Sequence, residues 1–222
     1  AGFAPHSVEV KVSIAEATKV DVRLEPAEAA AARTFSEADR LFLQGNKLYA
    51  ESKFAEAAAA YEEAIRLNAN QWAYQMNLGL ALKKMNRTEE AGAAFARALE
   101  LNPASFSATK ELAESLARTG KFEEARNYFQ KAVELSPDDP DVFYNLGVSL
   151  VNTGKSEAAL DAFLRCIELD RDYAEAYFQA GTLYIGQNKV HEALGNLERF
   201  LELAPDHEKA PVAKQLIEFL KK

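Results

Sequence analysis

Apolar side chains recur with helical spacing along residues 38–207, and the pattern repeats every 34 residues. Alanine marks the period most clearly, at Ala57, Ala91, Ala125, Ala159 and Ala193. Each alanine comes early in a run of helix-forming residues, where a larger side chain would hold two packed helices apart. The pattern therefore predicts one structural unit built five times, over residues 38–71, 72–105, 106–139, 140–173 and 174–207.

Three further columns define the repeat. The eighth position is small, with Gly45, Gly79, Ala113, Gly147 and Gly181. The 24th position is large and mostly aromatic, with Tyr61, Phe95, Phe129, Phe163 and Leu197. Prolines near the end of three units, Pro103, Pro137 and Pro205, are expected to stop the second helix of each pair. These columns resemble the tetratricopeptide repeat, which implies an all-α, right-handed α-solenoid of five helix-turn-helix units.

The turn between the two helices of each unit has its own signature. The residues at the end of the first helix are Ser52, Asn86, Gly120, Gly154 and Asn188. Glycine and asparagine adopt the left-handed conformation readily, so we expect that conformation throughout this column. A basic residue follows in every unit and an acidic one in most, which complements the helix dipoles on both sides of the turn.

The C-terminal residues 208–222 are predicted to form a capping helix. Val212, Leu216, Ile217 and Leu220 have helical spacing, which predicts one apolar face. Phe200 occupies a position where the repeat family prefers alanine. We therefore expect the fifth unit to pack against this tail rather than against a further repeat.

Residues 1–26 follow a different pattern, in which Val8, Val10, Val12 and Ile14 alternate with polar residues and a second alternation follows over 20–24. This period of two predicts a short β-hairpin, joined to the repeats by a linker over 27–37. The segment resembles the last two strands of a carboxypeptidase regulatory-like domain, a β-sandwich of bacterial envelope and secreted proteins. That resemblance favours an envelope, periplasmic or secreted location over a cytoplasmic one; the alternative is a hairpin native to a helical protein.

The composition of the chain argues against several classes of function. The net charge of −8 argues against binding to nucleic acid, and no apolar run approaches the length that spans a membrane. The single cysteine, Cys166, rules out an internal disulfide, and its place in a small-residue column predicts a buried, unreactive thiol. The histidines are scattered, and nothing resembles a nucleophile, base and orienting group together. We therefore expect no enzyme activity, no cofactor and no metal site.

The resemblance implies a concave groove lined by the first helices, which we interpret as a surface for a protein or peptide partner. The candidate groove residues are Phe42, Asn46, Tyr49, Met76, Asn77, Leu80, Lys83, Lys84, Lys110, Tyr144, Asn145, Val148, Phe178, Gln179 and Thr182. Exposed aromatic side chains and Met are typical of recognition surfaces, and Asn and Gln hold peptide backbones. Replacing Tyr144 and Phe178 by alanine is expected to weaken binding with little change in thermal unfolding. The alternative is that some of these side chains only pack between repeats.

Some tetratricopeptide repeat proteins hold the C-terminus of a chaperone in this groove. Asn46 and Asn77 match the asparagines that hold chaperone C-termini in some relatives, but Phe42, Ser107 and Glu111 replace the basic residues of that clamp, so we do not expect it. Other hypotheses are an accessory module of a larger secreted or envelope enzyme or transport system, and self-assembly, including a homodimer formed through the N-terminal hairpin.

Overall fold

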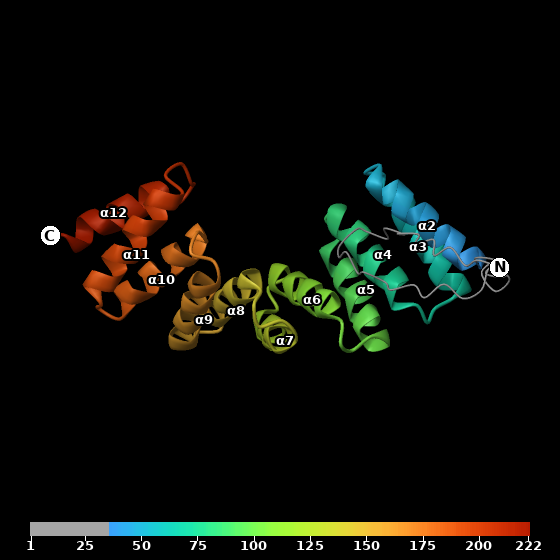
Figure 1. Cartoon of the computed structure of the whole chain (residues 1–222), viewed down its shortest axis with the longest axis horizontal. Helices are drawn as coiled ribbons and strands as arrows, with labels where there is room; N and C mark the ends of the chain where they lie inside the picture. The colour runs from blue at the N-terminus through green and yellow to red at the C-terminus, as the bar shows by residue number, and fades with distance from the viewer. Residues whose placement is uncertain (1–35) are drawn as a thin grey trace, which may run out of the picture. The chain divides into compact units, whose positions relative to one another are not determined.

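The 34-residue period forms helix pairs in the computed structural model, which describes residues 36–222 (Figure 1). These residues form eleven α-helices and no strand. The first helices of the five repeats are α2 (Glu37–Ala50), α4 (Trp72–Lys84), α6 (Phe106–Arg118), α8 (Pro140–Asn152) and α10 (Ala174–Gly186). The second helices are α3 (Phe54–Leu67), α5 (Thr88–Leu101), α7 (Phe122–Leu135), α9 (Ser156–Leu169) and α11 (Val190–Leu203), and α12 (Ala210–Leu220) follows. The predicted hairpin over residues 1–26 lies outside the described residues.

The chain divides into two compact units at the turn within the second repeat. The N-terminal unit ends at Arg87 and contains α2, α3 and α4. The C-terminal unit begins at Thr88 and contains α5 to α12. Each unit has buried clusters of its own.

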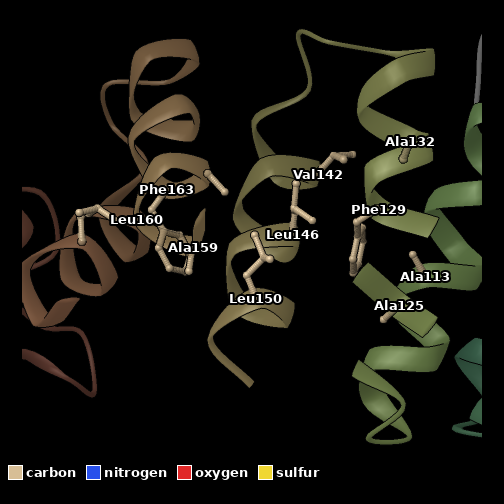
Figure 2. Packing of buried hydrophobic residues seen from close by; sticks show 12 residues of the cluster. Ala113, Ala125, Phe129, Ala132, Val142, Leu146, Leu150, Ala159, Leu160 and Phe163 are labelled. Atoms are coloured by element: carbon tan, nitrogen blue, oxygen red, sulfur yellow. The ribbon is translucent and has the colours of Figure 1, made fainter. Parts of the chain in front are cut away.

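The alanine column forms the close contacts that its spacing predicts. All five alanines, Ala57, Ala91, Ala125, Ala159 and Ala193, have no exposed surface. The large residue of the 24th position fills the space left by the small residue of the eighth, as Phe163 does beside Gly147. Figure 2 shows the middle of the C-terminal unit, where α8 presents Val142, Leu146 and Leu150 between α7 and α9.

The left-handed residues lie where the turn column predicts them. Backbone φ is 61° at Ser52, 59° at Asn86, 78° at Gly120, 73° at Gly154 and 58° at Asn188. After each of these residues the chain enters the second helix of its pair. The prediction is confirmed, and it includes Ser52, whose side chain is less suited to this conformation than Gly or Asn.

Proline is not required to end the second helix. α3 and α9 belong to the repeats without that proline, yet they end at the same repeat position as the others, at Leu67 and Leu169. In these two repeats the side chain after the helix closes a turn of its own. Asn68 Oδ1 accepts from the Asn70 N–H at 3.2 Å, and Asp170 Oδ1 accepts from the Asp172 N–H at 2.9 Å. These Asx turns stop the chain from continuing as a helix.

The tail forms the predicted cap on the fifth repeat. Phe200 is fully buried in a cluster with Ala213 and Ile217 of α12. Leu216 and Leu220 also pack against this cluster. Val212 does not, because 47% of its surface is exposed, so its assignment to the packed face of the cap is wrong.

Candidate partner-binding surface

The predicted binding residues lie on the first helices of each pair, which follow one another within each unit. α2 contacts α4 in the N-terminal unit, and α6 contacts α8 in the C-terminal unit. We call the surface of α2 and α4 the N-terminal face and that of α6, α8 and α10 the C-terminal face. Each face is held by buried residues beneath it, so its polar groups have defined positions.

Two asparagines and a tyrosine are joined on the N-terminal face. Asn46 Oδ1 accepts a hydrogen bond from the Tyr61 hydroxyl at 2.9 Å and another from Asn77 Nδ2 at 2.7 Å. Because both donors use the same oxygen, the two amides have fixed orientations. Asn46 keeps its NH2 group as a donor, and Asn77 keeps its carbonyl oxygen as an acceptor. The sequence prediction placed both asparagines correctly on neighbouring helices.

The apolar candidates of the N-terminal face are mostly structural. Met76 and Leu80 are buried, with 5% and 8% of their surface exposed, so they do not present a surface to a partner. Phe42 packs against the rings of Tyr61 and Tyr74, at centroid distances of 5.8 Å and 4.8 Å. The prediction that these side chains are exposed anchors is therefore wrong for Met76 and Leu80.

The remaining candidates of this face differ in exposure. Tyr49 packs edge-on against Phe54, with ring centroids 5.2 Å apart. Lys83 is half-buried and Lys84 is exposed.

A second polar contact joins the first two repeats. The Tyr74 hydroxyl donates to Asp39 Oδ1 at 2.6 Å, and Ser36 completes a capping box with the same carboxylate. The hydrogen bonds from Tyr74 and Ser36 lower the pKa of Asp39. Burial, together with Asp39, raises the pKa of Tyr74. This contact lies at the start of α2, away from the two asparagines in sequence.

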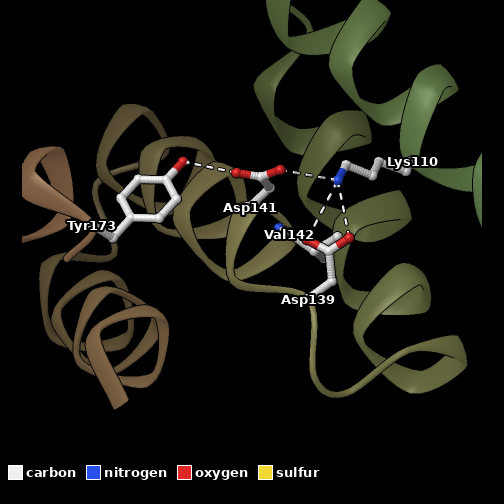
Figure 3. A network of polar contacts seen from close by, with 5 residues as sticks. All are labelled: Lys110, Asp139, Asp141, Val142 and Tyr173. Atoms are coloured by element: carbon white, nitrogen blue, oxygen red, sulfur yellow. Dashed lines mark hydrogen bonds and ion pairs between the residues drawn. The ribbon is translucent and has the colours of Figure 1, made fainter. Parts of the chain in front are cut away.

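The C-terminal face contains a chain of polar contacts from α6 through α8 to Tyr173, the N-cap of α10 (Figure 3). Lys110 Nζ lies 3.0 Å from Asp139 Oδ2 and 3.4 Å from Asp141 Oδ2. The Tyr173 hydroxyl donates to Asp141 Oδ1 at 3.1 Å. Burial lowers the pKa of Lys110, but the hydrogen bonds and charges of Asp139 and Asp141 outweigh it and raise that pKa above its usual range. Lys110 therefore stays charged and paired with the carboxylates of Asp139 and Asp141.

The aromatic candidates of the C-terminal face pack against buried rings. Tyr144 lies 5.7 Å from Phe163 and 5.1 Å from Tyr173, between ring centroids. Phe178 is only 9% exposed and packs on Phe200 at 5.2 Å. The expectation that alanine at Tyr144 and Phe178 leaves unfolding unchanged is therefore wrong, because both substitutions remove core contacts.

The more accessible candidates on this face are polar or small. Asn145, Val148, Gln179 and Thr182 are half-buried, and the Thr182 hydroxyl donates to the Gln179 carbonyl of its own helix at 2.8 Å. Burial raises the pKa of the Tyr144 hydroxyl, and hydrogen bonding with Gln179 offsets part of that rise. Gln179 is thus held by its hydrogen bond with the Tyr144 hydroxyl.

Sequence reasoning missed the acidic members of the network. Asp141 and Glu175 occupy the second repeat position, as Asp39 does, and their side chains are 57% and 42% exposed. An acidic residue at one repeat position in three units was the available signal. The sequence gives no sign that Asp141 contacts Tyr173, which lies at the other end of the same repeat.

A hollow of about 300 Å³ lies among α5, α6 and α7, apart from the predicted residues. Gly92, Ala93 and Ala96 line one wall, and Leu112 and Tyr128 line others. Gly92 stands where other repeats have Ala58, Arg126, Leu160 or Leu194. The missing side chain is the sequence signal for this hollow.

The part of the chain that the structure describes contains one free thiol, and that thiol is buried. Cys166 is fully buried, and desolvation raises the pKa of its thiol to about 12, which keeps it protonated at neutral pH. No group of three or more His, Cys, Asp or Glu side chains within residues 36–222 is arranged to hold a metal ion. No described helix combines the length and the apolar character needed to cross a membrane.

The repeats match known family models along most of the chain. Models of the tetratricopeptide repeat match residues 42–106, 78–140, 110–174 and 175–207. The chain is a tetratricopeptide repeat protein. The matches begin after the predicted hairpin, so the resemblance of residues 1–26 to a β-sandwich stays a prediction. A comparison with curated proteins gives no match.

Several solved structures of other proteins share this fold. YrrB, described as a TPR protein with an unusual peptide-binding site, is 26% identical, with 85% of this chain and 97% of that chain covered and a TM-score of 0.75. MamA from Desulfovibrio magneticus RS-1 is 18% identical, with 78% and 98% covered and a TM-score of 0.72. PilF of Pseudomonas aeruginosa is 16% identical, with 83% and 84% covered and a TM-score of 0.69.

Proposed function

We propose that the protein is a non-enzymatic scaffold that binds an extended peptide segment of a partner protein along the C-terminal face. YrrB, which is similar over most of its length, is described as having a peptide-binding site. The C-terminal face is the larger of the two first-helix faces, with three helices in one compact unit. An extended segment crossing three helices meets a polar side chain on each of them.

The observation that carries this proposal is the fixed polar row across α6, α8 and α10. Asp139 and Asp141 hold Lys110, Tyr173 holds Asp141, and the Tyr144 hydroxyl hydrogen-bonds with the Gln179 side chain. Groups held in place by neighbours lose little freedom when a partner binds, which favours affinity. Asn145 and Gln179 each offer a donor and an acceptor, the pair of functions that a peptide backbone requires.

The charges on this face favour a basic partner segment. Near the starts of α8 and α10, the three carboxylates of Asp139, Asp141 and Glu175 outnumber the two ammonium groups of Lys110 and of Lys209, whose Nζ lies 5.3 Å from the centroid of the Phe178 ring. Apolar surface lies farther along the same helices, where Val151 is 39% exposed. A segment with Lys or Arg beside a short apolar stretch complements both features.

Selection of random 12-residue peptides by phage display against the full chain tests the proposal. Enriched peptides are then measured by fluorescence anisotropy against Asn145→Ala and Gln179→Ala, two half-buried side chains of the face. Gln130→Ala, an exposed residue of the second helix α7, is the matched control. We expect binding to weaken about tenfold with either face variant and to stay unchanged with the control. Equal affinity for all three variants would place the peptide elsewhere.

The net charge of the enriched peptides and the salt dependence of their binding test the preference for a basic segment. We expect the enriched peptides to carry a net positive charge and to bind less tightly as salt increases. Glu175→Gln is expected to reduce that salt dependence without loss of fold, because the Glu175 side chain is 42% exposed and its ion-pair partner, His207 Nε2, is 3.7 Å away. Enrichment of acidic peptides would contradict the preference while leaving the site itself in place.

A further inference from the structure

Two positions beside the hollow among α5, α6 and α7 depart from the repeat pattern. Gly92 of α5 has no side chain, and a Cβ atom there would have Ser115 Cβ, at 3.3 Å, as its one neighbour within 4 Å among residues 36–222. Tyr128 of α7 occupies a position where three other repeats have alanine. These alanines are Ala60, Ala94 and Ala162. Tyr128 lines the hollow, yet a volume of about 300 Å³ remains, so the larger residue does not replace the missing one.

The fourth repeat shows what fills the corresponding space. Leu160 of α9 occupies the repeat position of Gly92 and is only 6% exposed. It belongs to the same buried cluster as three residues of α10. These residues, which occupy the repeat positions of Leu112, Ser115 and Leu116 of α6, are Ala180, Leu183 and Tyr184. The space that a leucine fills beside α10 is therefore open beside α6, and the array itself indicates that a large apolar side chain fits there.

The rim of the hollow carries an excess of negative charge. Among the residues that line it, Glu89 and Glu124 are carboxylates and Lys121 is the one cation. All three are exposed, and none of them forms an ion pair within residues 36–222. The two carboxylates belong to the first turns of α5 and α7, where solvent reaches them. A positive group next to an apolar one complements this rim.

We propose that the hollow binds one large apolar side chain of a partner protein, with a lysine or arginine of the partner next to it. The apolar anchor takes the place that Leu160 has in the fourth repeat, and the cation pairs with Glu89 or Glu124 at the rim. Sites for whole small molecules span about 300–1,000 Å³, so this hollow is at their lower limit. It suits a single anchoring side chain better than a separate ligand.

This site is distinct from the C-terminal face. Ser115 is turned about 140° around α6 from Lys110, because five residues separate the two positions. A partner can therefore occupy the hollow and leave the face open. The proposal does not depend on peptide binding at the C-terminal face, and either one can fail without the other.

A capped dipeptide with the required chemistry tests the site directly. The probe is N-acetyl-phenylalanyl-arginine amide, titrated to millimolar concentration into the ¹⁵N-labelled full chain. We expect saturable shifts of the backbone amide signals of Gly92 and Ser115. The amide signals of Asn145 and Gln179, on the C-terminal face, are expected to stay in place. A titration that leaves Gly92 and Ser115 unshifted would overturn the proposal.

Filling the hollow from within tests whether the shifts come from insertion. Gly92→Leu supplies the side chain that Leu160 supplies in the fourth repeat, and we expect it to weaken binding of the probe by at least about tenfold. Gly195→Leu is the matched control, because a Cβ atom there has no neighbour within 4 Å among residues 36–222, and it is expected to bind the probe as the wild type does.

A second filling variant guards against a local disturbance by Gly92→Leu, whose Cβ atom is close to Ser115. Ala96→Leu fills the hollow from another point of the same wall and matches Leu164 of the fourth repeat. We expect it also to weaken binding, while the midpoint of urea unfolding is not lowered. Undiminished binding of the probe by both filled variants would show that it binds elsewhere, against the proposal.

The charge of the probe tests the choice of occupant. N-acetyl-phenylalanyl-glutamate amide keeps the ring and reverses the charge, and we expect it to bind about threefold more weakly at low salt. The difference is expected to vanish in the double variant Glu89→Gln, Glu124→Gln. Equal binding of the two probes to the wild type would contradict a basic partner. Binding of benzyl alcohol as tight as that of the dipeptide would make the hollow a small-molecule site instead and would refute the proposed anchor.

Discussion

Gly147 lies so close to Phe163 that a Cβ atom on Gly147 would come within 2.6 Å of the ring atom Cε1. The same relationship joins Gly45 to Tyr61, at 2.5 Å. It explains why a small residue recurs at this repeat position, since the two helices of a pair touch there. The ring of the second helix occupies the space that a side chain on the first would need.

Gly147→Ala is therefore expected to destabilise the protein. Alanine favours a helix over glycine by about 1 kcal/mol, but overpacking a rigid core costs about 1–3 kcal/mol and outweighs that gain. Urea unfolding followed by circular dichroism measures the change in the free energy of unfolding. A more stable variant would mean that Phe163 moves aside without cost.

Gly195→Ala is the matched change in an open position. Gly195 lies within α11, and a Cβ atom there would meet nothing within 4 Å. We expect the free energy of unfolding to rise by about 0.5–1 kcal/mol, because alanine restricts the unfolded chain more than glycine does. The same urea titration checks it, and a loss of stability would show that the helix interior is not relaxed at this position.

Asp139 combines two roles that separate variants can resolve. Its Oδ1 accepts from the Val142 N–H at 3.1 Å as the N-cap of α8, and its Oδ2 lies 3.0 Å from Lys110 Nζ. Asp139→Ala removes both contacts and is expected to cost about 1–2 kcal/mol of unfolding free energy. Asp139→Asn keeps the capping oxygen and is expected to cost less. Equal losses in the two variants would assign the whole effect to the charge.

Cys166 gives the protein a defined response to alkaline pH. Burial raises the pKa of its thiol from 9.0 to about 12, so folding favours the protonated form. This contribution is fully present below pH 9.0 and is lost as the pH rises through about 12. Cys166→Ala removes the titrating group and places alanine where other repeats have Ala64, Ala98 and Ala132.

Between pH 8 and pH 10.5 we expect the wild type to lose about 2 kcal/mol more unfolding free energy than Cys166→Ala. The measurement is urea unfolding of both proteins under reducing conditions at the two pH values. At pH 8 the variant is expected to be less stable by no more than about 1 kcal/mol. Identical pH profiles would show that the buried thiol ionises without penalty. The Cys166 thiolate raises the pKa of Tyr144 and of Tyr173, so the difference between the two proteins includes the change in titration of these two tyrosines.

The repeat architecture was predictable because its columns are set by contacts within one helix pair. Gly147 with Phe163, the alanine column and the left-handed Asn86 each involve residues close in sequence, so the pattern alone indicates them. The membership of the binding face was less predictable. A repeat position tells which side of a helix a residue occupies, but not which side chain of the next repeat covers it.

Phe178 and Val212 illustrate the two directions of this error. Phe178 was expected on an exposed face, yet it packs on Phe200 because that position holds a ring in the fifth repeat. Val212 was expected in the cap contact, yet it faces outward because four apolar residues at helical spacing cover more than one side of a short helix. Contacts between repeats, such as Lys110 with Asp141, need coordinates to be found.

The turns that Asn68 and Asp170 close after α3 and α9 give the repeat two interchangeable stop signals. One residue added within a helix would turn the rest of that helix by about 100°, which would move its apolar side chains out of their packing columns. Mutation can therefore remove a proline from one copy and leave the spacing of all five intact. All five repeats therefore have the same length, although the residue that ends the second helix differs between them.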